Sequence, residues 1–545
     1  MLWWHALQPQ PRPTTWWEER LLSMQRLLCQ RWGIIALLLL ALAYRSAAIE
    51  RPLVGYFATK NVIYGMIARN WARGEATWDR PTLDVLKAGY KSWHLLEVPV
   101  AAYVAGSAWR LLGGSLDVWG RGISIALSVA SVGLMFAWLR QLHGDAVAWG
   151  ASIALALSPV SVIFGQMFML EASILCGMLL TAWSLEQFIA TRRRGALLVC
   201  GVTFALLLLT KIYLVLLLLP LGVRFFAACR VGEGVLQRKD VDLLCVTFAT
   251  AMLPAVAWVI GVYLTSRPSH PDSARIFYSL FDSVDAHQAT HSLFLKAEFY
   301  QRLLKNLATL VLTPLGLMAA LVGLAHPAAR RAWPWLVVAL VLIIALPRKF
   351  HELPYYYVVT LPGLCYLVGL GCQHSWQLWR WSPAFYLLCF LASVEFSLRA
   401  VAGPIGAEVA ENRGVLPAAR AIRKLTKIDE PVATMHGSTF DLLYYCDRPG
   451  WGLDVGSSTF VQDLLAAKQR GARYLVVAGF ETLARHAENE RLVTRLPRVR
   501  SGEDYCIYDL ASFIVAPISE DLPSPDANPT GETNSTTIPA APGTK

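Results

Sequence analysis

The chain is organised around a segment of mixed character, which reads AAIERPLVGYFATKNVIYGMIARNWARGEATWDRPTLDVLKAGYKSWHLLEVPVAAYVAGSAWRLLGGSLDVWGR from Ala47 to Arg121. It carries too many charges to lie within lipid, and too many aromatic residues for a plain linker. Basic and acidic side chains are interleaved in it with tyrosines and tryptophans. A loop of this composition, held at a bilayer surface, is suited to bind an anionic headgroup and a sugar together.

Long uncharged runs flank this segment and set the class of protein. The chain of 545 residues is 55% hydrophobic and only 16% charged, above the apolar content of soluble proteins. The runs are continuous rather than alternating, which predicts helices and not a β-barrel. We interpret the net charge of +11 as the excess of basic residues in cytoplasmic loops, and membrane lipids as the surroundings. A nucleic-acid partner is not expected, because no basic soluble domain is present.

The predicted fold is an all-α polytopic membrane protein with about eleven transmembrane helices, juxtamembrane helices and a small C-terminal α/β extracytoplasmic domain. The run from Ala196 to Phe226 is too long for one span of about 20 residues, and Thr210-Lys211 divides it. Runs of spanning length begin near Trp32, Ile123, Ala146, Leu170, Ala196, Ile212, Val241, Leu303, Ala332, Tyr355 and Pro383.

The charges of the loops decide whether the ambiguous segment Leu95 to Leu112 crosses the membrane. If this segment does not cross the membrane, the basic clusters at residues 192–194, 238–239 and 330–331 share a side with the basic amino terminus. The positive-inside rule therefore favours a juxtamembrane or re-entrant helix here. The amino terminus is then cytoplasmic, and the loops at 47–121 and 265–302 are extracytoplasmic.

Composition divides the chain into four parts. Residues 1–31 read as a cytoplasmic segment without a signal peptide, and residues 32–401 as the transmembrane domain. Residues 402–512 alternate helix-like and strand-like pieces, which predicts a soluble α/β domain outside the membrane, and residues 513–545 have the composition of a disordered tail. Cys446 and Cys506 lie in the soluble part, where a disulfide and two packed thiols are both open. No Cys/His spacing indicates a metal site.

Five short motifs bring chemistry to the predicted outer face. Each motif also has a purely structural interpretation. The basic side chains would reach lipid headgroups, the carboxylates would begin helices, and the lone histidine would pack in a turn. The convergence of two carboxylates and several cations on one face favours a site instead. The residues are Lys60, Asn61, Tyr64 and Arg69 on a surface helix with its basic side outward, His94 with Glu97, Glu171, Lys211, and Arg348, Lys349, His351, Tyr355 and Tyr356 in a late turn.

The order of these motifs resembles the GT-C membrane glycosyltransferases. The nearest branch is the dolichyl-phosphate-mannose protein mannosyltransferase-like group, which includes the lipid A aminoarabinose transferases. Leu209-Thr210-Lys211 is similar to the Leu-Thr-Lys of that family, and Phe164 to Glu171 to its tyrosine–glycine–arginine…methionine–carboxylate corner. His351 with Tyr355-Tyr356 is similar to its histidine–tyrosine–tyrosine element. The resemblance covers about residues 32–401.

One departure concerns the first loop. The family usually carries an acidic pair three and four residues before a tyrosine, whereas Lys60 and Asn61 hold those positions before Tyr64. In catalytic relatives an aspartate of that pair is the favoured base or metal-linked carboxylate. Either Glu97 or Glu171 then supplies the base here, the acceptor is unusual, or catalysis has been lost.

The resemblance implies transfer of a sugar from a polyprenyl-phosphate or pyrophosphate carrier to a lipid, glycan or protein acceptor on the extracytoplasmic face. Glu97 and Glu171 are the candidate base or sugar-orienting groups, and the cations Lys60, Arg69, Lys211, Arg348 and Lys349 are assigned to the phosphate, with His351 and Tyr355 beside them. No cofactor motif is present, and participation of a divalent cation is left open. A flippase of polyprenyl-linked sugars and a non-catalytic envelope-assembly protein are the alternatives. A bacterial inner membrane is the expected location.

Overall fold

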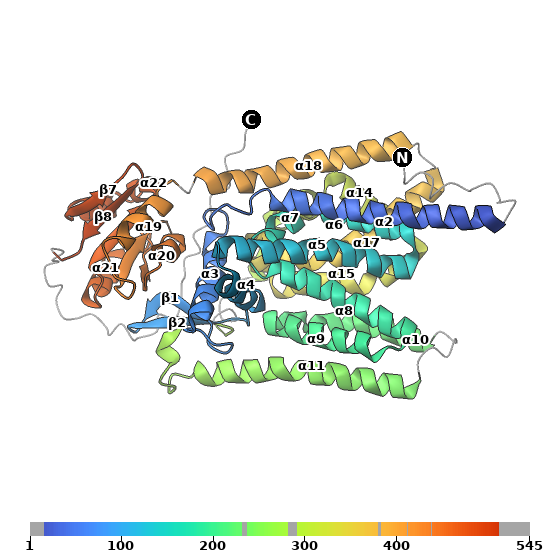
Figure 1. Ribbon diagram of the computed structural model, residues 1–545, viewed down its shortest axis with the longest axis horizontal. Helices are drawn as coiled ribbons and strands as arrows, with labels where there is room; N and C mark the ends of the chain where they lie inside the picture. The colour runs from blue at the N-terminus through green and yellow to red at the C-terminus, as the bar shows by residue number, and fades with distance from the viewer. Residues whose placement is uncertain are drawn as a thin grey trace.

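A computed structural model describes residues 16–230, 237–281, 291–379, 383–410, 413–437 and 439–511 of the chain. The predicted disordered tail at 513–545 and residues 1–15 of the predicted cytoplasmic segment lie outside these residues. Within them the protein is mostly helical. Long apolar helices run along one axis, and a smaller group of helices and strands lies beyond one end of the bundle (Figure 1).

Several of the bundle helices suit a bilayer. Six described helices are long and apolar enough to cross a membrane, or up to eight when two bent pairs each count as one span. The predicted number of eleven therefore remains a prediction. The helices along the bundle are α2 (Trp16–Ser46), α5 (Leu116–His143), α6 (Asp145–Leu157), α7 (Pro159–Gly165), α8 (Glu171–Thr191), α9 (Arg194–Thr210), α10 (Leu218–Arg230), α11 (Arg238–Thr265), α14 (Pro314–Leu324), α15 (Trp333–Ala345), α17 (Leu361–Trp379) and α18 (Pro383–Ala410).

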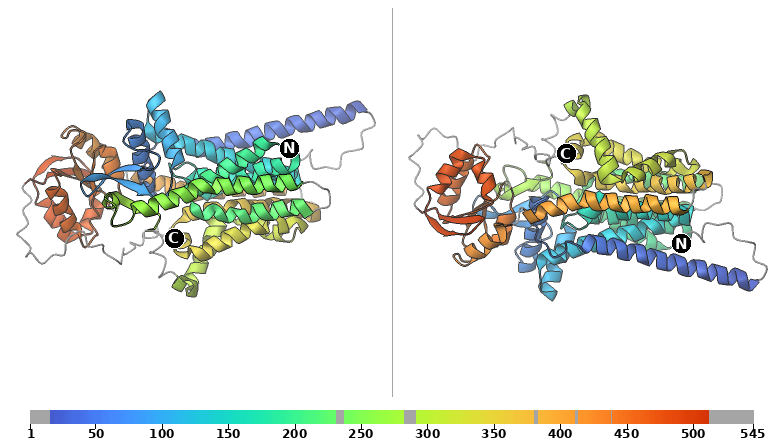
Figure 2. Two further views of the ribbon diagram at one scale, coloured as in Figure 1. Left: turned by 90° about the horizontal axis from the view of Figure 1, so that it is seen from below. Right: turned by 90° about the horizontal axis from the view of Figure 1, so that it is seen from above.

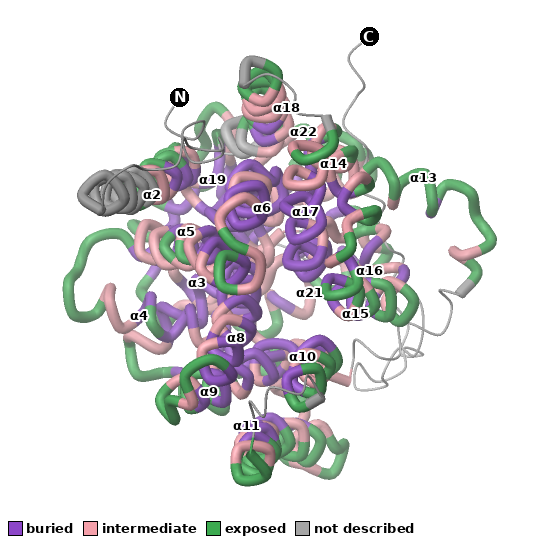
Figure 3. The backbone as a smooth tube through the Cα atoms, turned by 90° about the vertical axis from the view of Figure 1, so that its right-hand side faces the viewer, coloured by how far each residue is buried: buried purple, intermediate pink, exposed green. Residues whose placement is uncertain are grey.

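Burial separates inner from outer helices. The apolar segment that contains α17 is 83% buried inside the protein, whereas that of α11 is 28% buried and that of α18 only 11%. Figure 3 shows α17 near the centre of the end view, with α11 and α18 at its margins. Apolar side chains exposed over a whole helix are expected to face lipid rather than water.

A buried arginine compensates for a break between α6 and α7. The two helices meet at Ser158-Pro159 and bend by 57°. Proline cannot donate the backbone bond that would continue a helix, so carbonyl groups of the preceding turn lack intrahelical partners. Arg45, with no exposed surface, donates to the carbonyl oxygens of Leu155 and Ala156 and to the hydroxyls of Ser128 and Ser161.

Two helices from the first loop lie across the end of the bundle. α3 (Ala58–Arg73) and α4 (Val100–Leu112) run across its long axis (Figure 2). They approach closely because position 106 is glycine: a Cβ there would lie 2.2 Å from the Ala68 carbonyl oxygen. The ambiguous segment is thus a crosswise helix, but it begins at Val100 after Pro99 rather than at Leu95.

The first loop also contains a hairpin that the sequence analysis did not predict. β1 (Thr82–Lys87) and β2 (Tyr90–Leu95) pair antiparallel around Ala88 and Gly89, which both have positive φ. β3 (Ile276–Ser279) of the second large loop pairs with β2. β1 in turn pairs with β5 through Val85 and Gly450.

One eight-stranded sheet therefore joins the two loops to the C-terminal segment, in the order β3-β2-β1-β5-β4-β6-β8-β7. Helices α19 to α23 accompany the C-terminal strands (Figure 1). The C-terminal elements are α19 (Val415–Arg423), β4 (Val432–Met435), α20 (Asp441–Cys446), β5 (Gly450–Gly452), α21 (Phe460–Gln469), β6 (Tyr474–Ala478), α22 (Phe480–Ala484), α23 (Ala487–Thr494), β7 (Arg498–Ser501) and β8 (Tyr505–Asp509). Cys446 and Cys506 are buried free thiols and do not pair.

Candidate functional site

Glu97 is the most completely engaged carboxylate of the predicted site. It precedes α4 and is only 1% exposed. The Tyr64 hydroxyl donates to its Oε1 at 2.5 Å, His94 Nε2 lies 3.4 Å from the same oxygen, and the Lys211 ammonium donates to its Oε2 at 2.7 Å. Three motifs far apart in sequence therefore meet at one carboxyl group.

Charge explains why Glu97 and Lys211 are both ionised. Burial would raise the pKa of Glu97, but Lys211 and the hydrogen bond from His94 outweigh it and hold this pKa well below its usual range. Burial would likewise lower the pKa of Lys211, yet the Glu97 carboxylate raises it. Lys211 follows the last residue of α9 and precedes a short 3₁₀ helix, η1 (Ile212–Leu217), so the chain break places it beside the loop.

Glu171 is held less tightly. It is the first residue of α8 and is 3% exposed. Lys60 Nζ of α3 lies 3.8 Å from its Oε1, a distance too long for a hydrogen bond, while its Oε2 has no hydrogen-bond partner among the described residues. The Lys60 side chain keeps 22% of its surface exposed. Glu171 is thus a buried carboxylate with an unpartnered oxygen and a nearby, partly exposed cation.

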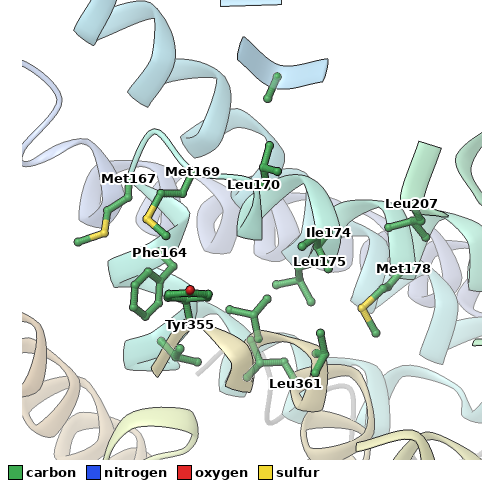
Figure 4. Packing of buried hydrophobic residues seen from close by; sticks show 14 of the residues in the cluster. Phe164, Met167, Met169, Leu170, Ile174, Leu175, Met178, Leu207, Tyr355 and Leu361 are labelled. Atoms are coloured by element: carbon green, nitrogen blue, oxygen red, sulfur yellow. The ribbon is translucent and has the colours of Figure 1, made fainter. Parts of the chain in front are cut away.

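Aromatic rings surround the Lys60 ammonium. It lies 3.8 Å from the centre of the Tyr355 ring, a cation–π contact. Tyr355 packs against Phe57 at 5.4 Å, Phe164 at 5.9 Å and Tyr356 at 5.0 Å between ring centres. Figure 4 shows Phe164 and Tyr355 side by side, with Met167 and Met169 next to them. These rings fix the position of Lys60 from one side and leave its ammonium facing Glu171.

The late turn contributes unequally. Lys349, in α16 (Pro347–Glu352), is half-buried, and burial together with the charges of Lys60 and Arg348 lowers its pKa. Arg348 donates to Glu352 at 2.9 Å on the surface. His351 lies 3.2 Å from Arg302 and stacks on Phe299 of α13 (Ala297–Asn306). α16 therefore adds one basic group to the surroundings of Lys60, while Arg348 and His351 make their contacts elsewhere.

Two residues of α3 do not match the expected arrangement. Arg69 is 6% exposed, and its guanidinium pairs with Asp84 at 2.6 Å and Asp447 at 3.2 Å, so it does not face outward. Five residues of helix separate it from Tyr64, which turns it away from the face that carries Lys60 and Tyr64. Asn61 is buried, donates to the Phe57 carbonyl, and has no described partner for its Oδ1.

Three further residues belong to the surroundings of the carboxylates. The ring centres of Tyr213 and Tyr356 lie 6.1 Å apart. Tyr278 of β3 stacks on His94 with 6.2 Å between the ring centres. Gln166 is 2% exposed, and neither atom of its amide has a partner among the described residues. Gln166 could have been selected from the sequence, because it lies in the same corner as Glu171. Tyr278 could not, since only the pairing of β2 with β3 brings it close.

No group of three or more His, Cys, Asp or Glu side chains that could hold a metal ion is found in the described part of the chain. The lysines are the cations that accompany the two carboxylates. A cleft of about 500 Å³ lies elsewhere, between the β1–β2 hairpin and the C-terminal segment, and is lined by residues such as Tyr90 and Arg470.

Comparison with known proteins identifies the fold. The model of the dolichyl-phosphate-mannose-protein mannosyltransferase family matches residues 97–258, which include Glu97, Glu171 and Lys211. The resemblance to GT-C glycosyltransferases is thereby confirmed, and so is the class of membrane protein. No curated protein sequence gives a significant match.

Solved structures agree with this assignment. ArnT from Cupriavidus metallidurans bound to undecaprenyl phosphate superposes with a TM-score of 0.58 at 16% identity, over 89% of this chain and 99% of that one. The Archaeoglobus fulgidus oligosaccharyltransferase in complex with zinc and sulfate gives 0.53 at 14% identity, over 81% and 68%. The same organism's AglB with an inhibitory peptide and a dolichol-phosphate gives 0.51 at 13%, over 82% and 70%. At these identities the likeness establishes the shared fold.

Proposed function

We propose that this protein is an integral-membrane glycosyltransferase that moves a sugar from a polyprenyl-phosphate carrier to an acceptor on the extracytoplasmic face. The observation that carries the proposal is the meeting of Glu97 with Lys211 and of Glu171 with Lys60 at one end of the bundle. Structural relatives crystallised with undecaprenyl phosphate or a dolichol-phosphate support the choice of carrier.

We assign the role of general base to Glu171. A base needs a free lone pair within reach of the acceptor hydroxyl, and Glu171 Oε2 has one. In the transfer step the acceptor oxygen attacks the anomeric carbon, the bond from that carbon to the phosphate oxygen breaks, and the hydroxyl proton passes to Glu171. The sugar ends on the acceptor, and the carrier leaves as a polyprenyl phosphate.

Glu97 has a different role. Three donors already occupy its two oxygens, so it is a poor proton acceptor. We infer that it positions Lys211 and Tyr64 and keeps the lysine charged.

Lys60 and Lys349 are proposed to neutralise the departing phosphate. Lys60 is partly exposed and loosely paired, and the pKa of Lys349 is lowered by its burial and by the positive charges around it. An arriving phosphate would relieve that repulsion, and cations aimed at a leaving group stabilise charge that develops in the transition state. Arg69 is left out of this set because it is committed to Asp84 and Asp447.

Location and domain structure belong to the same proposal. We place the amino terminus in the cytoplasm, and residues 402–512 outside a bacterial inner membrane as an α/β domain. The hairpin, β3 and the C-terminal strands form one sheet at the end of the bundle where Glu97 and Glu171 lie, which supports a common extracytoplasmic side.

The test is transfer of label from radioactive polyprenyl-phosphate sugars to cell-envelope acceptors by purified protein in nanodiscs. Glu171→Gln should lower transfer by about a hundredfold or more while retaining donor binding, because only the proton acceptor is lost. Tolerance of Glu171→Gln together with carrier movement across vesicles would indicate a flippase. Donor binding with no transfer by the native protein would indicate the non-catalytic alternative, which Lys60 and Asn61 in place of the acidic pair favour.

A further inference from the structure

The cleft between the β1–β2 hairpin and the C-terminal segment is not used by the proposed reaction. Its volume of about 500 Å³ lies within the range of small-ligand sites. One wall comes from the end of α3 and from the hairpin, including Glu75 and Tyr90. The opposite wall comes from the C-terminal segment, including Asp429 and Arg470.

The charges of the cleft restrict what it can hold. Four basic and four acidic side chains line it, so it has no excess of either sign. Arg73 and Lys91 are engaged with Asp447, Glu75 and Asp84. A phosphate or a nucleic acid would need surplus cations. A neutral ligand rich in hydroxyl groups can both donate and accept here.

Three groups remain available to such a ligand. Asp429 and Arg470 are exposed, and within the described residues neither side chain makes a hydrogen bond or ion pair. Tyr90 is 62% exposed, and Arg275 lies 5.2 Å from its ring centre. A carboxylate, a guanidinium and an aromatic ring together can bind the hydroxyls and the C–H face of a sugar.

One strand leads from the cleft toward the carboxylate of Glu97. β2 runs from Tyr90 to Leu95, and at about 3.3 Å per residue it separates Tyr90 from His94 by about 13 Å. His94 in turn contacts Glu97. An extended glycan of several units whose end lies at the reaction site could therefore reach the cleft.

We propose that this cleft binds the distal part of a neutral oligosaccharide acceptor. The inference rests on the proposed transferase function, since it names the class of acceptor as a glycan. The cleft acts as a subsite that holds a growing or extended chain while its terminal sugar meets Glu171.

The first experiment measures binding without turnover. Purified protein in nanodiscs is titrated calorimetrically with neutral gluco- and manno-oligosaccharides of increasing length, with anionic oligosaccharides and with an unstructured polar peptide. We expect neutral oligosaccharides to bind, and the Tyr90→Ala and Asp429→Ala/Arg470→Ala variants to bind about tenfold more weakly, as the loss of one or two hydrogen bonds or a stacking contact predicts. The matched control is Trp78→Ala, an equally exposed aromatic residue of the same loop outside the cleft.

Binding should also survive Glu171→Gln, which separates this proposal from the proposed function. If native protein transfers sugar but binds no neutral oligosaccharide, or binds it equally well in Tyr90→Ala, the cleft proposal is overturned and the transferase stands. Preferential binding of the peptide or of anionic glycans would also overturn it. If neutral oligosaccharides bind in a way that depends on Tyr90 but the native protein transfers no sugar, the cleft proposal stands and only the transferase proposal is overturned.

Discussion

At the scale of single residues, the two buried carboxylates differ in what they still have to offer. Glu97 accepts from three donors, whereas Glu171 has one loose cation and one unpartnered oxygen. Sequence alone treated the two as equivalent, because spacing shows neither which lysine each one meets nor how many donors surround it. The Glu97–Lys211 pair and the late turn supply the predictions at this scale.

The first concerns the buried pair of Glu97 and Lys211. Glu97→Gln should destabilise the protein by about 3–5 kcal/mol, because it leaves a buried ammonium without its partner. The double variant Glu97→Gln/Lys211→Met should recover part of that loss. Chemical unfolding in micelles measures both. A double variant no more stable than the single one would show that the two charges are not coupled.

The same pair predicts a dependence of stability on pH. The folded-state pKa of Glu97 is below its unfolded value, so its contribution is complete above about pH 4.3 and is lost as the pH falls. The pKa of Lys211 is raised, so its contribution is lost as the pH rises beyond its ordinary value near 10.4. The unfolding temperature of the native protein should fall at both low and high pH, and that of the double variant should change less.

The second residue-scale prediction concerns donor binding. Lys349→Met should raise the KM for the polyprenyl-phosphate donor about tenfold or more with a smaller change in kcat, because it removes a charged phosphate contact. Arg348→Met is the matched control: the Arg348 guanidinium is already paired with Glu352, so the KM should change little. Equal effects of the two substitutions would argue against a specific role for Lys349.

At the scale of elements, α3 and α4 carry or flank most of the site and lie across the bundle. The sequence predicted a juxtamembrane or re-entrant helix from loop charge, and the chain break at Lys211 from the length of an apolar run. It did not predict the hairpin, although two β-rich runs flank Ala88-Gly89 at the two-residue spacing typical of one. Nor could it place Arg69, whose half-buried partner Asp447 lies hundreds of residues away.

The close approach of α3 and α4 gives the element-scale prediction. Gly106→Ala should destabilise the protein by about 1–3 kcal/mol and lower transfer, because the new Cβ would collide with the Ala68 carbonyl oxygen. Gly222→Ala on α10 is the control, since nothing lies within 4 Å of a Cβ there. Alanine favours helix over glycine, so this control should be neutral or stabilising. Thermal unfolding followed by tryptophan fluorescence compares the two.

At the scale of the whole molecule, the end of the bundle that carries the carboxylates also joins the C-terminal segment through one sheet. Asp117, in the first turn of α5, accepts hydrogen bonds from the Tyr444 and Tyr445 hydroxyls of α20 at 2.7 and 2.6 Å. The composition of residues 402–512 predicted helices and strands there. It contained no sign that the sheet would continue into loops of the membrane domain, because strand pairing over such distances leaves no local pattern.

Sidedness is the whole-molecule prediction. In a variant without native cysteines, Asp429→Cys should react with a membrane-impermeant maleimide in intact spheroplasts, and Arg193→Cys only after lysis. The positive-inside rule places Arg193 in the cytoplasm, and the shared sheet places Asp429 on the side of the site. Equal labelling of both positions before lysis would overturn the proposed topology.

The buried Arg45 has a consequence for how the chain is made. Its partner Ser161 is 116 residues further along, which corresponds to roughly ten seconds of synthesis at common translation rates. Until Ser128 and then the α6–α7 break have been synthesised, the guanidinium of the first helix has only the Ala41 carbonyl of its own helix among these partners, and we expect it to stay near water or headgroups. The amino-terminal helix α2 can therefore take its final position only after α7 has left the ribosome. Assembly of this protein in the membrane then does not follow the order of its sequence.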